Sequence, residues 1–312
     1  MSILLIGDLT RSEYELWRGR LKACLPAGEQ LVLPHEDYLS GDVDIALVAN
    51  PPAGTLSQLR SLKFIQSLWA GVDRLLSDPA LPREVPIARL VDPNLTQAMV
   101  ECVVAHVLFL HRQTARYQRQ QSSAEWRQLP QPSAMQRRVC VLGLGQLGRA
   151  AARAVASLGF SVVGWGATPR MVTGIKALHG AERLNSVLRD AEILVNLLPL
   201  TPQTAGILSK ELFDALPHGA SIINVARGGH LVEEDLLPAL AAGQISHAIL
   251  DVFQTEPLPP HHPFWSHPQV SIFPHVAAAT DPDSAAQIAA QNIAAFRAGR
   301  TPVSLVDRVK GY

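Results

Sequence analysis

Short apolar runs alternate with amphipathic segments along the first part of the chain. The runs SILLIG, VDIALVA, KFIQSL and PIARL are separated by polar stretches, and residues 12–24 have the apolar spacing of a helix. Apolar runs of this length are typical of buried strands, and their alternation with helices predicts βα units around a parallel sheet.

The pattern changes after residue 95. One long helix is predicted from Thr96 to about Gln120, apolar in its first half and polar in its second, and a loop rich in Ser, Gln and Pro follows to about Gln136. We interpret this region as a domain boundary. Residues 281–300 are Ala-rich, start with capping acids and end near Gly299, which predicts a helix that returns to the first domain.

A second series of strands starts at Val139. It consists of six apolar runs, VCVL, SVVGW, EILVNLL, ASIINVA, HAILDVF and VSIFP. Six strands separated by helices match the count of a complete dinucleotide-binding sheet. We therefore expect a doubly wound parallel sheet here.

Charge and composition exclude several classes of function. The 312 residues include 27 basic and 27 acidic side chains, and this balance disfavours binding to nucleic acid or to an anionic membrane. The N-terminus carries no basic leader, and the apolar segment Ala98–Leu110 is shorter than the ~20 residues that span a bilayer. Three widely spaced cysteines indicate no disulfide framework. A cytoplasmic protein with a small substrate is expected.

A glycine-rich turn opens the second series. Gly143, Gly145 and Gly148 form G-x-G-x-x-G between an apolar strand and an Ala-rich helix. In a dinucleotide-binding turn, the first glycine permits the tight bend, the second leaves room for pyrophosphate and the third lets helix and strand pack closely. We expect the turn to bind a nicotinamide dinucleotide.

The position that usually carries an acid to hold the adenosine ribose is occupied by Gly166, within the stretch GWGATPR. A carboxylate there would repel a 2′-phosphate. Thr168 can donate a hydrogen bond, and Arg170 can pair with a phosphate in a bidentate way. This favours NADPH, with NADH possible; the alternative is that GATPR is only a surface turn.

Three further stretches carry residues suited to redox chemistry: NVARGGHLVEEDLL with Arg227, LDVFQTEPLPP with Glu256, and SIFPHVAAAT with His275. In this order they closely resemble the D-2-hydroxyacid dehydrogenase family. Together with SLWAGVDRLL and PLPPHHPFWSHPQV, they look most like its glyoxylate/hydroxypyruvate reductase A branch. The resemblance implies an α/β enzyme with a Rossmann cofactor domain and a smaller, flavodoxin-like substrate domain.

The chemistry fits these residue types. Hydride delivery to the carbonyl carbon of a 2-oxo acid leaves negative charge on oxygen, and a protonated His275 can supply the proton. Glu256 would orient the ring and favour its charged form. Arg227 would bind the substrate carboxylate and polarise the carbonyl oxygen. The histidines of HHPFWSH, His261, His262 and His267, lack a metal-ligand pattern, so no metal is expected.

The resemblance also assigns binding residues. Ala70, Gly71 and Val72 would hold the substrate carboxylate by their backbone N–H groups, and Trp69, Met99 and Trp265 would narrow the pocket. Asp251 would contact the nicotinamide amide. The other expected cofactor contacts are Gln146, Leu147, Trp165, Leu198, Pro199, Thr204 and Ala226.

We therefore predict a cofactor domain of residues 99–280 and a substrate domain of residues 1–98 and 281–312, with the site between them. The expected reaction is NADPH-dependent reduction of glyoxylate to glycolate or of hydroxypyruvate to D-glycerate. A homodimer is implied, with the helix 96–120 and its following loop as the contact. The alternatives are a dehydrogenase for a bulkier 2-oxo acid and a non-catalytic dinucleotide-sensing interaction protein.

Overall fold

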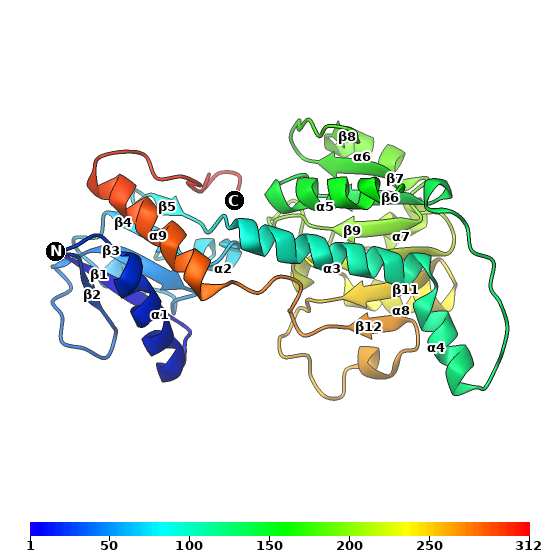
Figure 1. Cartoon of the computed structure of the whole chain (residues 1–312), viewed down its shortest axis with the longest axis horizontal. Helices are drawn as coiled ribbons and strands as arrows, with labels where there is room; N and C mark the ends of the chain where they lie inside the picture. The colour runs from blue at the N-terminus through cyan, green and yellow to red at the C-terminus, as the bar shows by residue number, and fades with distance from the viewer. The chain divides into compact units, whose positions relative to one another are not determined.

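The computed structural model describes residues 1–312. They divide into two compact units, Met1–Leu95 with Thr280–Tyr312, and Thr96–Ala279. Each unit is built around its own parallel sheet (Figure 1). The α/β fold class predicted from the apolar pattern is confirmed.

The sheet of the first unit has the strand order β2-β1-β3-β4-β5, and all its pairings are parallel. This order is that of flavodoxin-like folds. Side chains of β1 alternate between the two faces of the sheet. Ile3 and Leu5 pack in the core on one face, and Leu4 and Ile6 pack in the core on the other. The strands are β1 (Ser2–Gly7), β2 (Gln30–Val32), β3 (Val43–Ala49), β4 (Phe64–Ser67) and β5 (Ile87–Ala88).

Helices α1 (Arg11–Cys24) and α9 (Pro282–Arg297) lie side by side on one face of this sheet (Figure 1). The small side chains of α9, such as Ala286 and Ala289, pack in the same core as Trp17 of α1. The predicted return of the C-terminal helix to the first sheet is therefore observed. The other face is covered by residues from η1 (Leu56–Gln58), α2 (Asp73–Leu76) and nearby loops.

The sheet of the second unit has the order β12-β11-β10-β9-β6-β7-β8, again entirely parallel. It has seven strands where the sequence predicted six. The missed strand is β8, a short edge strand that lacks a continuous apolar run and has exposed ends. The strands are β6 (Arg138–Leu142), β7 (Ser161–Gly166), β8 (Lys176–His179), β9 (Ile193–Asn196), β10 (Ala220–Asn224), β11 (Ile245–Leu250) and β12 (Val270–Ile272).

Helices cover both faces of this sheet (Figure 1). On one face lie α3 (Pro93–His111) and α5 (Gln146–Ser157). On the other lie α6 (Ala181–Leu188), α7 (Lys210–Ala215) and α8 (Glu233–Ala241). This is the doubly wound arrangement expected of a Rossmann-type sheet. The remaining elements are α4 (Thr114–Ser122), η2 (Ala134–Gln136), η3 (Gly228–His230) and η4 (Pro263–Ser266).

The prediction of one continuous helix from Thr96 to Gln120 is wrong. The chain breaks between α3 and α4, where Gln113 adopts a left-handed backbone with φ 55°. The Gln113 side chain donates a hydrogen bond to the carbonyl of Pro130 at 2.6 Å. The polar segment after His111 carries few apolar residues, so little packing holds it in line with α3.

Helix α3 is also longer than the apolar segment recognised in the sequence. With 19 residues it is long and apolar enough to cross a bilayer, contrary to the expectation drawn from the shorter segment 98–110. Its Met99, Val103 and Val107 are buried in the core of the second unit, and Glu101 interrupts the apolar run.

Candidate active site and cofactor site

The glycine turn lies at the carboxyl end of β6, beside β9, where the strand order of the sheet reverses. Gly143 has a φ of 94°, and a Cβ there would lie 2.4 Å from the carbonyl oxygen of Leu197. A Cβ on Gly148 would lie 1.7 Å from the carbonyl oxygen of Gly143. Both positions therefore require glycine for packing within the protein.

Gly145 is different, because nothing lies within 4 Å of a Cβ built there. It is the N-cap of α5, so unpaired backbone N–H groups of the first helical turn begin at this open position. Open space beside a helix N-terminus suits the pyrophosphate of a dinucleotide. These features fit a nicotinamide dinucleotide, and the flanking Gln146 and Leu147 are half-buried at the same turn.

Strand β7 ends at Gly166, as expected for the ribose-binding position. A Cβ on Gly166 would meet only ordinary contacts, the nearest at 3.7 Å from the carbonyl oxygen of Thr168. Arg170 is exposed and makes no hydrogen bond or ion pair. The preceding Trp165 is buried, and its indole N–H donates to the carbonyl of Gly180 at 2.9 Å. The groups available to a ligand here are thus the backbone that follows Gly166 and the exposed guanidinium of Arg170.

The segment after β9 is a tight turn fixed by one hydroxyl. Thr204 donates a hydrogen bond to the carbonyl of Pro199 at 2.7 Å and accepts one from the N–H of Thr201 at 2.9 Å. Leu198 is buried, and its N–H donates to the side chain of Asn196. Thr204 therefore shapes the turn, and its expected contact with cofactor stays a prediction.

Arg227 follows β10 and is half-buried. The side chain of Asn224 donates to the Arg227 carbonyl at 3.0 Å, and Nη1 of Arg227 donates to the carbonyl of buried Ala226 at 2.7 Å. A Cβ on the next residue, Gly228, would lie 1.9 Å from the backbone of Phe253. Glycine at this position lets the Arg227 segment pack directly against the segment that leads to Glu256.

Glu256 and His275 form a hydrogen-bonded pair, with 2.7 Å between Oε2 and Nδ1. Oε1 of Glu256 accepts the N–H of Phe253 at 2.9 Å, which fixes the carboxylate. The two side chains are 36 % and 51 % exposed, and Nε2 of His275 has no hydrogen-bond partner. The ring therefore presents one nitrogen to an incoming molecule while the other is held.

The backbone of His275 is held in an unusual conformation by Asp251. His275 has a φ of 55°, and its N–H donates to the Asp251 carbonyl at 2.8 Å. The two Asp251 carboxylate oxygens accept the N–H groups of Val276 and Ala277 at 2.8 and 3.0 Å. Burial nevertheless raises the pKa of Asp251. This arrangement stabilises a strained conformation at the proposed proton donor.

The predicted substrate loop belongs to the first unit and follows β4. Ser67 clamps it, because its hydroxyl accepts the N–H of Trp69 and donates to the Trp69 carbonyl, both at 3.1 Å. The N–H groups of Ala70, Gly71 and Val72 donate to no acceptor in the structure. The row of free donors suits a carboxylate. Ser67 was not among the expected site residues, although a serine that ends a strand before such a loop is a recognisable signal.

Two residues expected in the substrate pocket lie in other settings. Met99 is buried in the hydrophobic core of the second unit with Val103 and Val107. Trp265 is 54 % exposed, and its indole N–H donates to the carbonyl of Pro259 at 3.0 Å. Their place in a substrate pocket stays a prediction.

The histidine-rich stretch forms protein contacts. His262 pairs with Glu233 at 3.2 Å and accepts the N–H of Phe264, which ties the segment after Glu256 to the start of α8. No group of three or more His, Cys, Asp or Glu side chains in the structure is arranged to hold a metal ion. The three cysteines are free. Burial raises the pKa of Cys140 to about 12 and that of Cys102 to about 11, so both thiols are unreactive.

Comparison with known proteins agrees with this geometry. Residues 104–277 match the family model of the NAD binding domain of D-isomer specific 2-hydroxyacid dehydrogenases. Glyoxylate/hydroxypyruvate reductase A of Yersinia enterocolitica is 43 % identical, over 96 % of this chain and 97 % of the relative. The reductase of the same name from Serratia proteamaculans is 44 % identical, over 96 % of each chain.

Solved structures give the same result. A D-isomer specific 2-hydroxyacid dehydrogenase from Xanthobacter autotrophicus, in complex with NADPH and MES, has a TM-score of 0.94 at 38 % identity, over 100 % of this chain and 99 % of that one. The NADPH-dependent glyoxylate/hydroxypyruvate reductase of Sinorhizobium meliloti, in complex with NADP and sulfate, has a TM-score of 0.92 at 36 % identity, over 100 % of both chains. The chain therefore belongs to the D-isomer specific 2-hydroxyacid dehydrogenase family and is an oxidoreductase.

Proposed function

We propose that the protein is an NADPH-preferring reductase of small 2-oxo acids, which converts glyoxylate to glycolate and hydroxypyruvate to D-glycerate. The observation that carries the proposal is the Glu256–His275 pair, whose free Nε2 is exposed at the end of a dinucleotide-binding sheet. Relatives that share 43 % and 44 % of the sequence are reductases of these two acids, which supports the choice of substrate.

The cofactor, when bound at the glycine turn, supplies the hydride that reduces the carbonyl carbon. His275 donates a proton from Nε2 to the carbonyl oxygen, and Glu256 holds Nδ1 and compensates the charge of the imidazolium before transfer. Arg227 binds the substrate through its guanidinium and stabilises the negative charge that develops on oxygen. The free N–H groups of Ala70, Gly71 and Val72 bind the substrate carboxylate.

The preference for NADPH rests on the end of β7. The residue at this strand end is Gly166, so the position carries no carboxylate that would repel a 2′-phosphate. Arg170 has no competing ion pair, so pairing with a phosphate would not disrupt an existing contact. Two structural relatives hold NADPH or NADP, in keeping with this preference.

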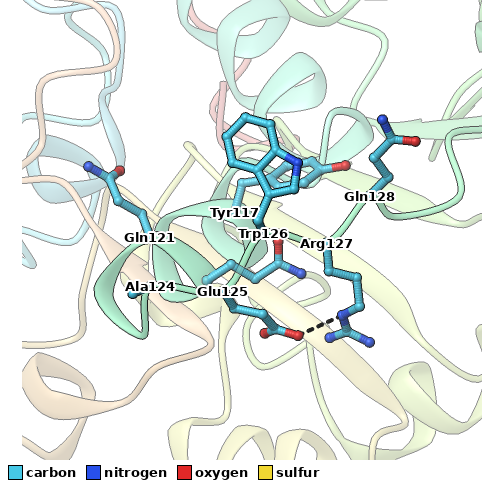
Figure 2. Close-up of a pocket in the computed structure, with 8 residues that line it drawn as sticks. Tyr117, Gln121, Ala124, Glu125, Trp126, Arg127 and Gln128 are labelled. Atoms are coloured by element: carbon cyan, nitrogen blue, oxygen red, sulfur yellow. Dashed lines mark ion pairs between the residues drawn. The ribbon is translucent and has the colours of Figure 1, made fainter.

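We also propose that the protein acts as a homodimer in the cytoplasm. The contact would lie at α4 and the loop after it, where Trp126 is 99 % exposed and Tyr117 is 40 % exposed. Figure 2 shows these two side chains beside an open hollow, with the ion pair between Glu125 and Arg127 at its rim. Large exposed aromatic side chains of this kind are enriched at interfaces.

Sedimentation of Trp126→Glu tests the dimer. A buried charge at the contact should shift the protein to monomer, whereas Val309→Glu should not, although Val309 is also 98 % exposed. If both variants keep the mass of the unmodified protein, Trp126 is not at a subunit contact.

The function itself is tested by oxidation of NADPH in the presence of glyoxylate or hydroxypyruvate. Turnover only with a larger acid such as phenylpyruvate would favour a related dehydrogenase of bulkier substrates. Binding of cofactor without turnover would favour a dinucleotide-sensing protein.

A further inference from the structure

Arg89 is a half-buried cation that has no anionic partner. It follows β5 directly, and the only hydrogen bond of its side chain is a long one of 3.5 Å from Nη1 to the carbonyl of Leu90. No carboxylate forms an ion pair with it, and burial lowers the pKa of its guanidinium. A partly desolvated charge without an anionic partner costs stability, which raises the question of what compensates Arg89 in the working protein.

The other half-buried arginines of the first unit, Arg18 and Arg308, have close polar partners, although Nε of Arg18 makes no hydrogen bond. Arg297 pairs with Asp44 and Glu29, and Arg18 pairs with Glu36. Arg308 donates to the carbonyls of Pro82 and Val85 at 2.8 and 2.6 Å. Arg89 thus differs from Arg18 and Arg308 in having no close carboxylate or carbonyl partner for its guanidinium.

The position of Arg89 suggests which anion could pair with its guanidinium. The N–H of Leu90 donates to the carbonyl of Trp69 at 3.0 Å, which places the strand end that carries Arg89 beside the loop from Trp69 to Val72. The backbone of Arg89 is anchored by its own N–H, which donates to the carbonyl of Ser304 at 3.1 Å. Ligands of parallel α/β sheets bind at this carboxyl edge.

We propose that Arg89 is a substrate-binding residue that takes the carboxylate of the 2-oxo acid, together with the free N–H groups of Ala70, Gly71 and Val72. A guanidinium offers paired donors that match the two oxygens of a carboxylate. The inference deepens the proposed function and rests on it. It also predicts selection for anionic acids, because a neutral ester or amide of the same size leaves the guanidinium uncompensated.

The first test measures ligand binding without catalysis, so that it is separate from the proposed function. Oxalate, a small dianion that cannot be reduced here, is added to the protein with NADPH present, and the melting temperature is recorded. We expect oxalate to raise the melting temperature of the unmodified protein but not that of Arg89→Met. Without oxalate, Arg89→Met should be at least as stable as the unmodified protein, because it removes an uncompensated charge.

The second test uses steady-state kinetics with a matched control. Arg89→Met should raise KM for glyoxylate about 10- to 100-fold, as expected for loss of a charge-assisted contact, and should leave KM for NADPH unchanged. Arg89→Lys should restore part of the affinity. Arg308→Met should lower the melting temperature and leave KM for glyoxylate unchanged.

Equal stabilisation of the unmodified protein and Arg89→Met by oxalate would overturn the proposal, as would unchanged KM for glyoxylate in a folded Arg89→Met. If Arg89→Met does not fold, Arg89→Gln gives the same comparison with a polar side chain of similar length. Absence of turnover in the unmodified protein would instead contradict the proposed function, and the oxalate measurement would still decide the role of Arg89.

Discussion

Nδ1 of His275 lies 2.7 Å from Oε2 of Glu256, and the other oxygen of this carboxylate accepts the N–H of Phe253. The contact fixes both the direction of the ring and the nitrogen that is left free. A ring held in this way can donate from Nε2 alone. The proposed chemistry follows from this pair and from the way Asp251 holds the backbone at His275.

The first prediction concerns the proton donor. His275→Ala should lower kcat by about 10²- to 10⁴-fold, because the alkoxide that develops in the reaction loses its acid. The dissociation constant for NADPH, measured by fluorescence, should change little. Turnover close to that of the unmodified protein would remove the acid role from His275.

Arg227→Ala should mainly weaken use of the 2-oxo acid. We expect KM for glyoxylate to rise and kcat/KM to fall by at least about tenfold, since a charge-assisted contact is lost. The affinity for NADPH serves as the internal control. Unchanged KM and kcat/KM for glyoxylate would show that Arg227 does not contact the 2-oxo acid.

Cofactor choice is tested at the end of β7. Gly166→Asp should shift the ratio of kcat/KM for NADPH over NADH toward NADH, because the new carboxylate repels a 2′-phosphate and accepts from a ribose hydroxyl. The site has room, since a Cβ there would make only ordinary contacts. Gly166→Asn is the uncharged control of the same size. Equal ratios in the aspartate and asparagine variants would show that this position does not face the ribose phosphate.

Stability should fall in mild acid because of His247. This side chain is 7 % exposed, its Nε2 lies 2.9 Å from the Ser271 hydroxyl, and burial lowers its pKa to about 4. The unfolded chain, with an ordinary histidine, binds the proton first as pH falls. Neutral His247 therefore contributes fully to the free energy of unfolding above about pH 6.5. This contribution, about 2 to 3 kcal/mol, is lost as the pH falls toward 4.

Denaturant unfolding of His247→Gln at pH 7 and at pH 4.5 measures this contribution. The variant should show a smaller loss of unfolding free energy between the two pH values than the unmodified protein. An identical pH dependence would assign the acid sensitivity to other groups.

Most of the fold was predictable because strong apolar runs, such as Ile3–Ile6 and Ile45–Ala49, form buried parallel strands. What was missed lacks this signal. Strand β8 lies at an edge with exposed ends, and the break at Gln113 depends on a side-chain contact with Pro130, which is distant in sequence. Propensity and periodicity do not encode such contacts.

For the site, the glycine turn could be recognised because its spacing follows from backbone geometry. The supporting contacts could not, since they join residues far apart in the chain. Asp251 holds the backbone after His275, and Gly228 lets the Arg227 segment meet Phe253. Arg89 lies within the apolar run PIARL, and only the structure shows that its guanidinium has no anionic partner.

The proposed reductase activity is measured directly by the initial rate of absorbance loss of NADPH and of NADH, each with glyoxylate, hydroxypyruvate and phenylpyruvate. We expect fast oxidation of NADPH with the two small acids, slower oxidation of NADH, and little activity with phenylpyruvate. No oxidation of either cofactor by the small acids, despite measurable cofactor binding, would show that the protein is not a reductase of these acids.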